Sequence, residues 1–193
     1  MPWGAKGRWA LLAALFISAA HAQVEERMAA QLRSCAGCHG ADGNSVTTGA
    51  PSLAAQPKIF LENYLVLSRE GLRGPPVMQA LLKGVPDKEI VALSMHYSGL
   101  KATANIDPVD KKLFQRGKDI ASKNRCSSCH ESTFRGREQM PRLAGQREEF
   151  LAEVMLAYRQ NRRPGGDTIM AASLYGIPET DFKAMAHYFS RLK

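Results

Sequence analysis

The stretch RSCAGCHG, residues 33–40, sets two cysteines three positions apart and places a histidine directly after the second. The stretch NRCSSCHE, residues 124–131, repeats this arrangement. All four cysteines of the 193-residue chain stand in these two stretches. The residues concerned are Cys35, Cys38 and His39 in the first stretch and Cys126, Cys129 and His130 in the second. The chain therefore presents the same chemistry twice.

The spacing Cys-x-x-Cys-His is typical of covalent haem c attachment. Two thiols at this spacing can add to the two vinyl groups on one edge of a porphyrin, and the adjacent histidine can then bind the iron. Zinc and disulfides are the competing uses of paired cysteines. Zinc sites usually separate their pairs by about 15–20 residues, and a disulfide within Cys-x-x-Cys closes a loop too short to stabilise the fold much. We therefore expect two covalently bound haem c groups.

The similarity between the two halves extends well beyond the cysteines. The segment PSLAAQ, residues 51–56, corresponds to PRLAGQ, residues 141–146, and MQALLKGVPDKEI from residue 78 corresponds to MAASLYGIPETDF from residue 170. This repeat predicts two copies of one unit of roughly 80–90 residues, which is within the usual range for small domains. We place the first domain at residues 23–103 and the second at residues 104–193.

The spacing of apolar residues predicts helices in both copies and almost no strands. A last helix is expected after Pro86 in the first copy and after Pro178 in the second. Asp107 followed by Pro108 predicts the N-cap and first position of the second domain's first helix. The expected fold class is all-α, with two tandem domains of three or four helices each. Units of this size bury little apolar surface alone, and a bulky apolar cofactor inside each would remedy that.

The first 22 residues have the layout of a secretory signal peptide. Lys6 and Arg8 precede an apolar run, and Ala20-His21-Ala22 forms a small-residue cleavage site. The apolar run is shorter than the roughly 20 residues that a membrane-spanning helix needs; an uncleaved anchor is the alternative. We expect cleavage after Ala22 and a mature protein in the bacterial periplasm.

Each iron needs a second axial ligand opposite its histidine, unless that position is open. Met78 and Met170 occupy equivalent places in the repeat, 39 residues after His39 and 40 residues after His130, in stretches rich in Gly and Pro that suggest loops. A methionine thioether is a usual ligand in electron-transfer haem proteins. We therefore expect one iron between His39 and Met78 and the other between His130 and Met170.

Two further pairs of residues bear on these iron sites. His96 and His187 are the remaining histidines after residue 22 and are alternative ligands, although a helix surface or a core position suits them better. Pro51 and Pro141 follow the two motifs at nearly the same distance. A metal-binding histidine usually donates its other ring N–H to a nearby acceptor, and each proline carbonyl suits that role. The alternative is that the prolines only turn the chain.

The segments CAGCHGADGNS, PSLAAQ and LSREGLRGPPVMQALL, together with the final helix, resemble class I cytochromes c. The tandem arrangement is similar to the dihaem cytochromes of the c4 type. The resemblance implies two cytochrome c domains related by a pseudo-twofold axis, with haem propionate edges near the interface. It also implies His/Met ligation at both irons and a proline carbonyl bonded to each axial histidine, with the residues His39, Met78, Pro51, His130, Met170 and Pro141.

The second copy departs from this pattern after its motif. Glu131 stands where the first copy has Gly40, and ESTFRGREQM replaces GADGNSVTTG. We expect a different local structure around the second haem and two unequal midpoint potentials. In the first copy, Ala55 replaces the glycine usual in the Pro-x-Leu-x-Gly-Gln segment, which is a smaller change.

Filled axial positions leave no place for a substrate, so we expect an electron carrier rather than an enzyme. Its partners would be redox proteins, with a terminal oxidase fitting as acceptor only by family analogy, and no small-molecule substrate is expected. One alternative is a dihaem enzyme, a peroxidase or a sulfur-compound oxidising catalyst, with one open haem position. Another is the electron-accepting subunit of a periplasmic dehydrogenase.

The charge is distributed unevenly between the two copies. Residues 23–105 carry eight Lys and Arg against seven Asp and Glu, whereas residues 106–193 carry 16 against 11. A basic second domain favours an acidic partner or peripheral association with a membrane surface; an ordinary solvated surface is the alternative. Despite the net charge of +8, an exported haem protein is not expected to bind nucleic acid.

Overall fold

The computed structural model describes residues 23, 25–103 and 106–193 of the chain. The predicted signal peptide and its cleavage site after Ala22 lie outside these residues, and so does residue 104, where we place the start of the second domain. Within the described ranges, no helix is long and apolar enough to cross a membrane.

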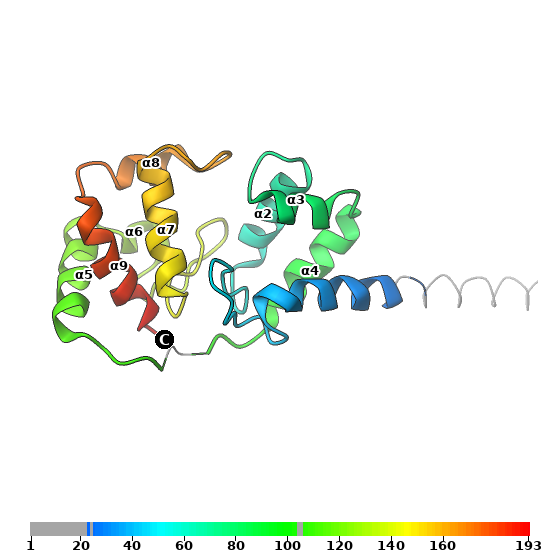
Figure 1. Cartoon of the computed structure of the whole chain (residues 1–193), viewed down its shortest axis with the longest axis horizontal. Coiled ribbons are helices and arrows are strands. Elements are labelled where there is room, and N and C mark those ends of the chain that lie inside the picture. Colours follow the sequence, from blue (N-terminus) through cyan, green and yellow to red (C-terminus); the bar gives the residue numbers. More distant parts are fainter. Residues whose placement is uncertain (1–22, 24, 104–105) are drawn as a thin grey trace, which may run out of the picture.

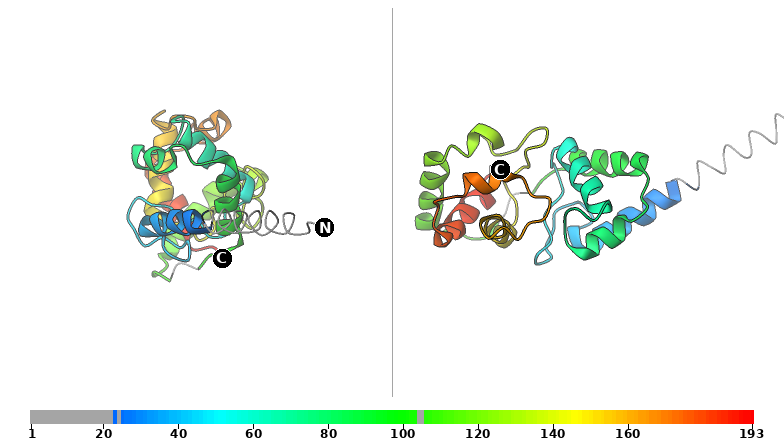
Figure 2. Two further views of the ribbon diagram at one scale, coloured as in Figure 1. Left: turned by 90° about the vertical axis from the view of Figure 1, so that its right-hand side faces the viewer. Right: turned by 90° about the horizontal axis from the view of Figure 1, so that it is seen from above.

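The helices fall into two bundles that lie side by side (Figures 1 and 2). The first bundle contains a helix over residues 25–39 and the helices α2 (Lys58–Arg69), α3 (Pro76–Leu82) and α4 (Asp87–Gly99). The second contains α5 (Lys111–Lys123), α6 (Ser127–His130), α7 (Glu148–Arg159), α8 (Thr168–Ser173) and α9 (Glu179–Ser190). Among the described residues, β-structure is limited to one isolated bridge between Arg137 and Met140. The predicted all-α fold of two tandem domains is confirmed.

The start of α5 differs from the prediction. Asp107 and Pro108 precede the helix, and the N-cap is Asp110, whose carboxylate accepts hydrogen bonds from two N–H groups of the first turn. The backbone N–H of Asp110 itself donates to Nε2 of the buried His187 on α9, at 3.0 Å. Because this contact ties Asp110 to α9, the helix begins three residues later than the sequence pattern indicates.

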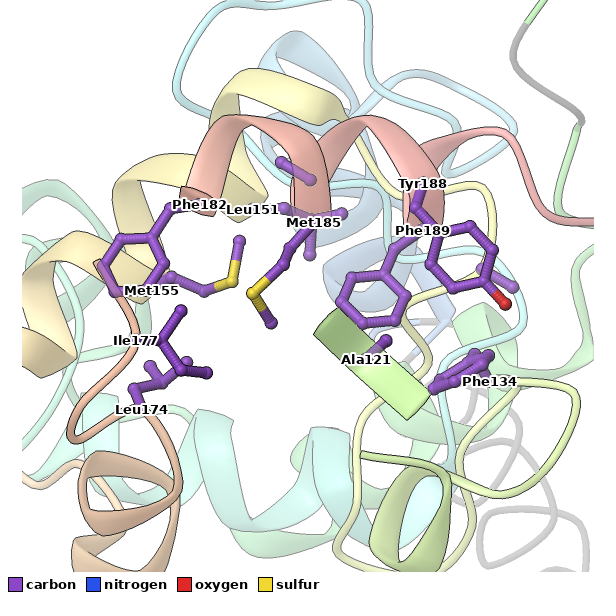
Figure 3. Close-up of a cluster of buried hydrophobic side chains, with 12 residues drawn as sticks. Ala121, Phe134, Leu151, Met155, Leu174, Ile177, Phe182, Met185, Tyr188 and Phe189 are labelled. Carbon is purple, nitrogen blue, oxygen red and sulfur yellow. The ribbon is translucent and has the colours of Figure 1, made fainter. Parts of the chain in front are cut away.

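The core of the second domain lies where α5, α7 and α9 meet. Met155 of α7 and Phe182, Met185 and Phe189 of α9 are all buried there. In Figure 3, Met155 and Met185 point into the same interior, with Leu174 and Ile177 on one side and Ala121 and Phe134 on the other. The first domain has a smaller cluster of buried residues, formed by Leu82, Val85 and Ile90.

The backbone turn that follows each motif is shared, although the sequence predicts a difference there. The carbonyl of Gly43 accepts the N–H groups of two consecutive residues, 53 and 54, and the carbonyl of Phe134 accepts those of residues 143 and 144. Glu131 has a positive φ of 66°, as Gly40 has one of 82°. Phe134 also has a positive φ, and its ring lies 4.9 Å from that of Phe189. Aromatic packing therefore holds a conformation in the second copy that glycine adopts freely in the first.

The local structure differs before the motif instead. In the first copy the helix over residues 25–39 runs through the motif without a break. In the second copy α5 ends at Lys123, Arg125 has a positive φ of 53°, and the separate short helix α6 carries His130.

Side chains cross between the two domains at several points. Arg147 of the second domain donates to the carbonyl of Ser45 in the first at 2.9 Å, and Arg73 of the first donates to the hydroxyl of Tyr158 in the second at 3.2 Å. Two buried glutamines, Gln56 and Gln146, also bond across the interface to the opposite backbone.

Candidate haem sites

The four cysteines form two separate pairs, one in each domain, and none forms a disulfide. Cys35 and Cys126 are half-buried, whereas Cys38 and Cys129 are exposed. Burial raises the pKa of the Cys35 thiol and of the Cys126 thiol. A zinc site built from both pairs would need three or more ligands to meet, and no such group of His, Cys, Asp or Glu gathers in the part of the chain that the structure describes.

The histidine of each motif is held in one orientation by a proline carbonyl. Nδ1 of His39 lies 2.8 Å from the carbonyl oxygen of Pro51, and Nδ1 of His130 lies 2.9 Å from that of Pro141. Because a carbonyl only accepts, Nδ1 carries the proton and Nε2 presents its lone pair. Burial lowers the pKa of both histidines, which favours the neutral imidazole that binds metals.

Met78 and Met170 lie on short helices rather than in the loops that their Gly- and Pro-rich surroundings suggest. Pro76 is the first residue of α3, and Asp167 caps α8 by accepting the N–H groups of the residues at 169 and 170. Both methionines are half-buried against the apolar cluster of their own domain. In the second domain, Cys126 packs against the same cluster as Met170.

The other two histidines are placed differently. Both ring nitrogens of His187 are bonded within the protein, since Nε2 accepts the N–H of Asp110 at 3.0 Å and Nδ1 lies 2.9 Å from a carboxylate oxygen of Glu148. His96 is exposed on α4, and its ring lies edge-on to that of Tyr97. Neither presents a free ring nitrogen from a buried ring as His39 and His130 do.

Three residues near these sites were not predicted. The hydroxyl of Tyr97 forms a hydrogen bond with the Cys35 thiol, and burial raises the pKa of Tyr97 strongly. Gln56 and Gln146 end the two repeated segments PSLAAQ and PRLAGQ, so the repeat itself marks them. Their partners are in the opposite domain, which the repeat does not reveal.

The residues present fit a covalently attached haem in each domain. Two unpaired thiols at the required spacing stand beside a buried imidazole whose Nε2 has no hydrogen-bond partner among the described residues. In the second domain, Cys126 packs against a cluster of apolar side chains that converge on one interior (Figure 3). Such surroundings limit solvent access and thereby raise the potential of a bound iron.

Comparison with known proteins agrees with this chemistry. Residues 114–193 match the Cytochrome c family. The chain is 28% identical over 167 residues to cytochrome c4 of Pseudomonas aeruginosa, covering 82% of this chain and 83% of that protein. It is 27% identical to a thiosulfate dehydrogenase electron acceptor of Stutzerimonas stutzeri, over 82% of this chain and 78% of that one. The crystal structure of reduced recombinant cytochrome c4 from Pseudomonas stutzeri shares the fold, with a TM-score of 0.79, 24% identity, and coverage of 87% and 98%.

Fold, motifs and relatives together define a c-type cytochrome that functions in electron transfer. Each Cys-x-x-Cys-His motif attaches one haem c covalently. The duplication covers both domains and the c4 relatives align with 82% of the chain, and these similarities support a dihaem cytochrome of the c4 type.

Proposed function

We propose that the chain is a periplasmic electron carrier in which His39 and Met78 hold one haem iron and His130 and Met170 hold the other. Haem iron held in this way takes up and releases one electron without offering a position to a substrate. The observation that carries the proposal is the buried imidazole that bonds a proline carbonyl through Nδ1 and has no partner for Nε2 among the described residues, which recurs in both domains.

The chain's own residues would fix both the geometry and the potential of these sites. The carbonyls of Pro51 and Pro141 orient the two imidazoles and increase the basicity of Nε2. Met78 lies near the start of α3, whose first residue is Pro76, and Met170 lies near the start of α8, which Asp167 caps. The different apolar clusters around the two methionines support two unequal midpoint potentials.

Optical and magnetic spectra of both oxidation states test this assignment. We expect two haems with sulfur and nitrogen axial ligands, and no binding of carbon monoxide by the reduced wild-type protein. Met78→Ala and Met170→Ala should each open one haem to carbon monoxide. Met95→Ala is the matched control, because Met95 is 59% exposed on α4. Carbon monoxide binding by the wild type would support the dihaem enzyme alternative and contradict the carrier.

A second candidate function is that of the dedicated electron-accepting subunit of a dehydrogenase. The relative from Stutzerimonas stutzeri that is named a thiosulfate dehydrogenase electron acceptor supports it. If this candidate is correct, a thiosulfate dehydrogenase from the same cell should copurify with the chain and reduce it faster than a respiratory donor does. Faster exchange with a respiratory donor or a terminal oxidase would favour the general carrier.

The basic second domain supports steering of an acidic partner or binding to an anionic membrane surface. The rate of reduction by the partner should then fall as salt is added, because exposed charges are screened within about 10 Å at 0.1 M salt. A rate independent of salt would leave the basic surface without a role in docking. Export is tested separately by N-terminal sequencing of the periplasmic protein, which should begin at Gln23.

A further inference from the structure

The peptide group that follows each supporting proline is bonded at both ends. In the first domain, the peptide between Pro51 and Ser52 accepts Nδ1–H of His39 at its carbonyl and donates its N–H to Oε1 of Gln146, 2.8 Å away. Gln146 belongs to the second domain. One planar amide therefore joins the predicted axial histidine of one domain to a side chain of the other.

The second domain repeats this arrangement in the opposite direction. The peptide between Pro141 and Arg142 accepts Nδ1–H of His130 and donates its N–H to Oε1 of Gln56, 3.0 Å away. The two contacts are thus reciprocal, and they use the same position of the repeat in each copy.

Both glutamine side chains are fixed in these contacts. Nε2 of Gln146 donates to the carbonyl of Ser52 at 2.9 Å, and Nε2 of Gln56 donates to the carbonyl of Arg142 at 3.0 Å. The glutamines are 5% and 4% exposed for Gln56 and Gln146, so water does not replace these bonds easily. Each side-chain amide therefore grips one backbone residue of the other domain at two points.

Such a chain of hydrogen bonds changes the histidine at its far end. An amide whose N–H is hydrogen-bonded becomes a better acceptor at its carbonyl, by about 10–30% per bond. A stronger acceptor draws the Nδ1 proton away from the ring, makes Nε2 a stronger donor to a metal, and favours the more oxidised state.

We propose that Gln56 and Gln146 are crossed positioning residues, each of which sets the orientation and basicity of the axial histidine in the other domain. The inference rests on the proposed axial roles of His39 and His130. It makes the potential of each haem depend on the contact with the neighbouring domain, beyond the local environment of its own bundle.

Redox titration of the full-length dihaem protein tests this inference. We expect Gln146→Ala to raise the midpoint of the first haem, changing its ferrous-to-ferric ratio at a fixed potential by up to about fourfold, as a change of about 10–30% in a charge-assisted bond would give. The midpoint of the second haem should stay unchanged. Gln56→Ala should raise the midpoint of the second haem and leave that of the first unchanged. Gln115→Ala is the matched control, because Gln115 is exposed and its side chain bonds to Asp119 within the same helix, α5.

The two haems can be told apart without reference to their axial ligands. In a Cys35→Ala background the first haem keeps one vinyl group conjugated with its ring, which displaces its absorption band; Cys126→Ala marks the second haem if the first variant does not mature. Gln146→Glu separates positioning from loosening, because its carboxylate keeps an acceptor for Ser52 N–H, replaces the donor by a second oxygen, and adds a negative charge that opposes a rise in midpoint. It should not raise the midpoint of the first haem.

Three outcomes would overturn the proposal: no shift in either glutamine variant, equal shifts at both haems, or equal rises from Gln146→Ala and Gln146→Glu. The last two would mean general loosening of the interface. These results differ from a failure of the proposed function, which would already appear in the wild type as a haem without histidine ligation or as absence of reversible electron exchange.

Discussion

Gly117 allows α5 and α9 to approach more closely than any other residue would permit. A Cβ atom at this position would lie 2.6 Å from the carbonyl carbon of Ala184 and 2.7 Å from Cβ of Tyr188, whereas ordinary contact begins at 3.4 Å. These neighbours belong to the backbone and the base of a side chain of α9, so no rotamer change removes the overlap. The variant Gly117→Ala therefore has to move the two helices apart.

The cost of this movement follows from the same distances. Separating the helices by about 0.8 Å forfeits roughly a quarter to a half of the dispersion energy across their contact. Overpacking of a core costs about 1–3 kcal/mol, and we take the upper end because the obstacle is backbone. The higher helix propensity of alanine returns about 1 kcal/mol. We expect Gly117→Ala to lower the free energy of unfolding by about 2 kcal/mol.

Urea unfolding of the haem-loaded protein, followed by far-UV circular dichroism and haem absorbance, measures this effect. Gly99→Ala is the matched control, since Gly99 is also helical and an added Cβ there meets nothing within 4 Å. The control should be unchanged or slightly stabilised. A Gly117→Ala protein as stable as the wild type would refute the reasoning, because it would mean that α5 and α9 can move apart without a loss of unfolding free energy.

Three further changes test the conformations found in the repeat. Ala55 has a positive φ of 55°, so Ala55→Gly should raise the stability in thermal unfolding by about 0.5–1 kcal/mol, after the greater freedom of glycine in the unfolded chain is subtracted. Phe134→Gly restores the residue type of the first copy but removes a buried ring, and urea unfolding should show a loss of about 3 kcal/mol. Asp110 has a pKa below its usual 3.8 because it accepts hydrogen bonds from the N–H groups of Leu113 and Lys112. A group whose pKa is lower in the folded state stabilises the fold at pH values above its unfolded pKa, and this stabilisation is lost as the group is protonated. The wild type should therefore melt at a higher temperature than Asp110→Asn at neutral pH, and this difference should disappear well below pH 3.8.

The sequence was sufficient to predict the parts of the structure that depend on local spacing. The two motifs placed each histidine next to its pair of thiols, and the repeat predicted two helical domains with the same order of elements. The helices after Pro86 and Pro178 begin where expected, because proline sets the backbone angle at their N-caps. These features need only neighbours in the chain.

Features that depend on contacts between residues distant in the chain could not be predicted from the sequence. Asp107 and Asp110 are both able to cap α5, and the contact of Asp110 with His187 on α9 decides between them. Glu131 and Phe134 take positive φ values without being glycine, which nothing in the local sequence indicates. The structure around these two residues holds their positive φ angles and compensates a cost of about 1–3 kcal/mol each.

The glutamines of the repeat show why duplication has consequences beyond a doubled cofactor. A single domain that carries the segment Pro-x-Leu-x-x-Gln can orient its own histidine through the proline carbonyl, but the bonds from its glutamine to the opposite backbone require a second copy. When two copies meet, Gln56 and Gln146 each bond the backbone next to the opposite proline. One six-residue segment thus supports the histidine and builds the interface at the same time. A substitution of either glutamine should therefore change the haem site of the opposite domain, whereas a substitution elsewhere in a bundle, such as Gly117→Ala, should act mainly on its own domain.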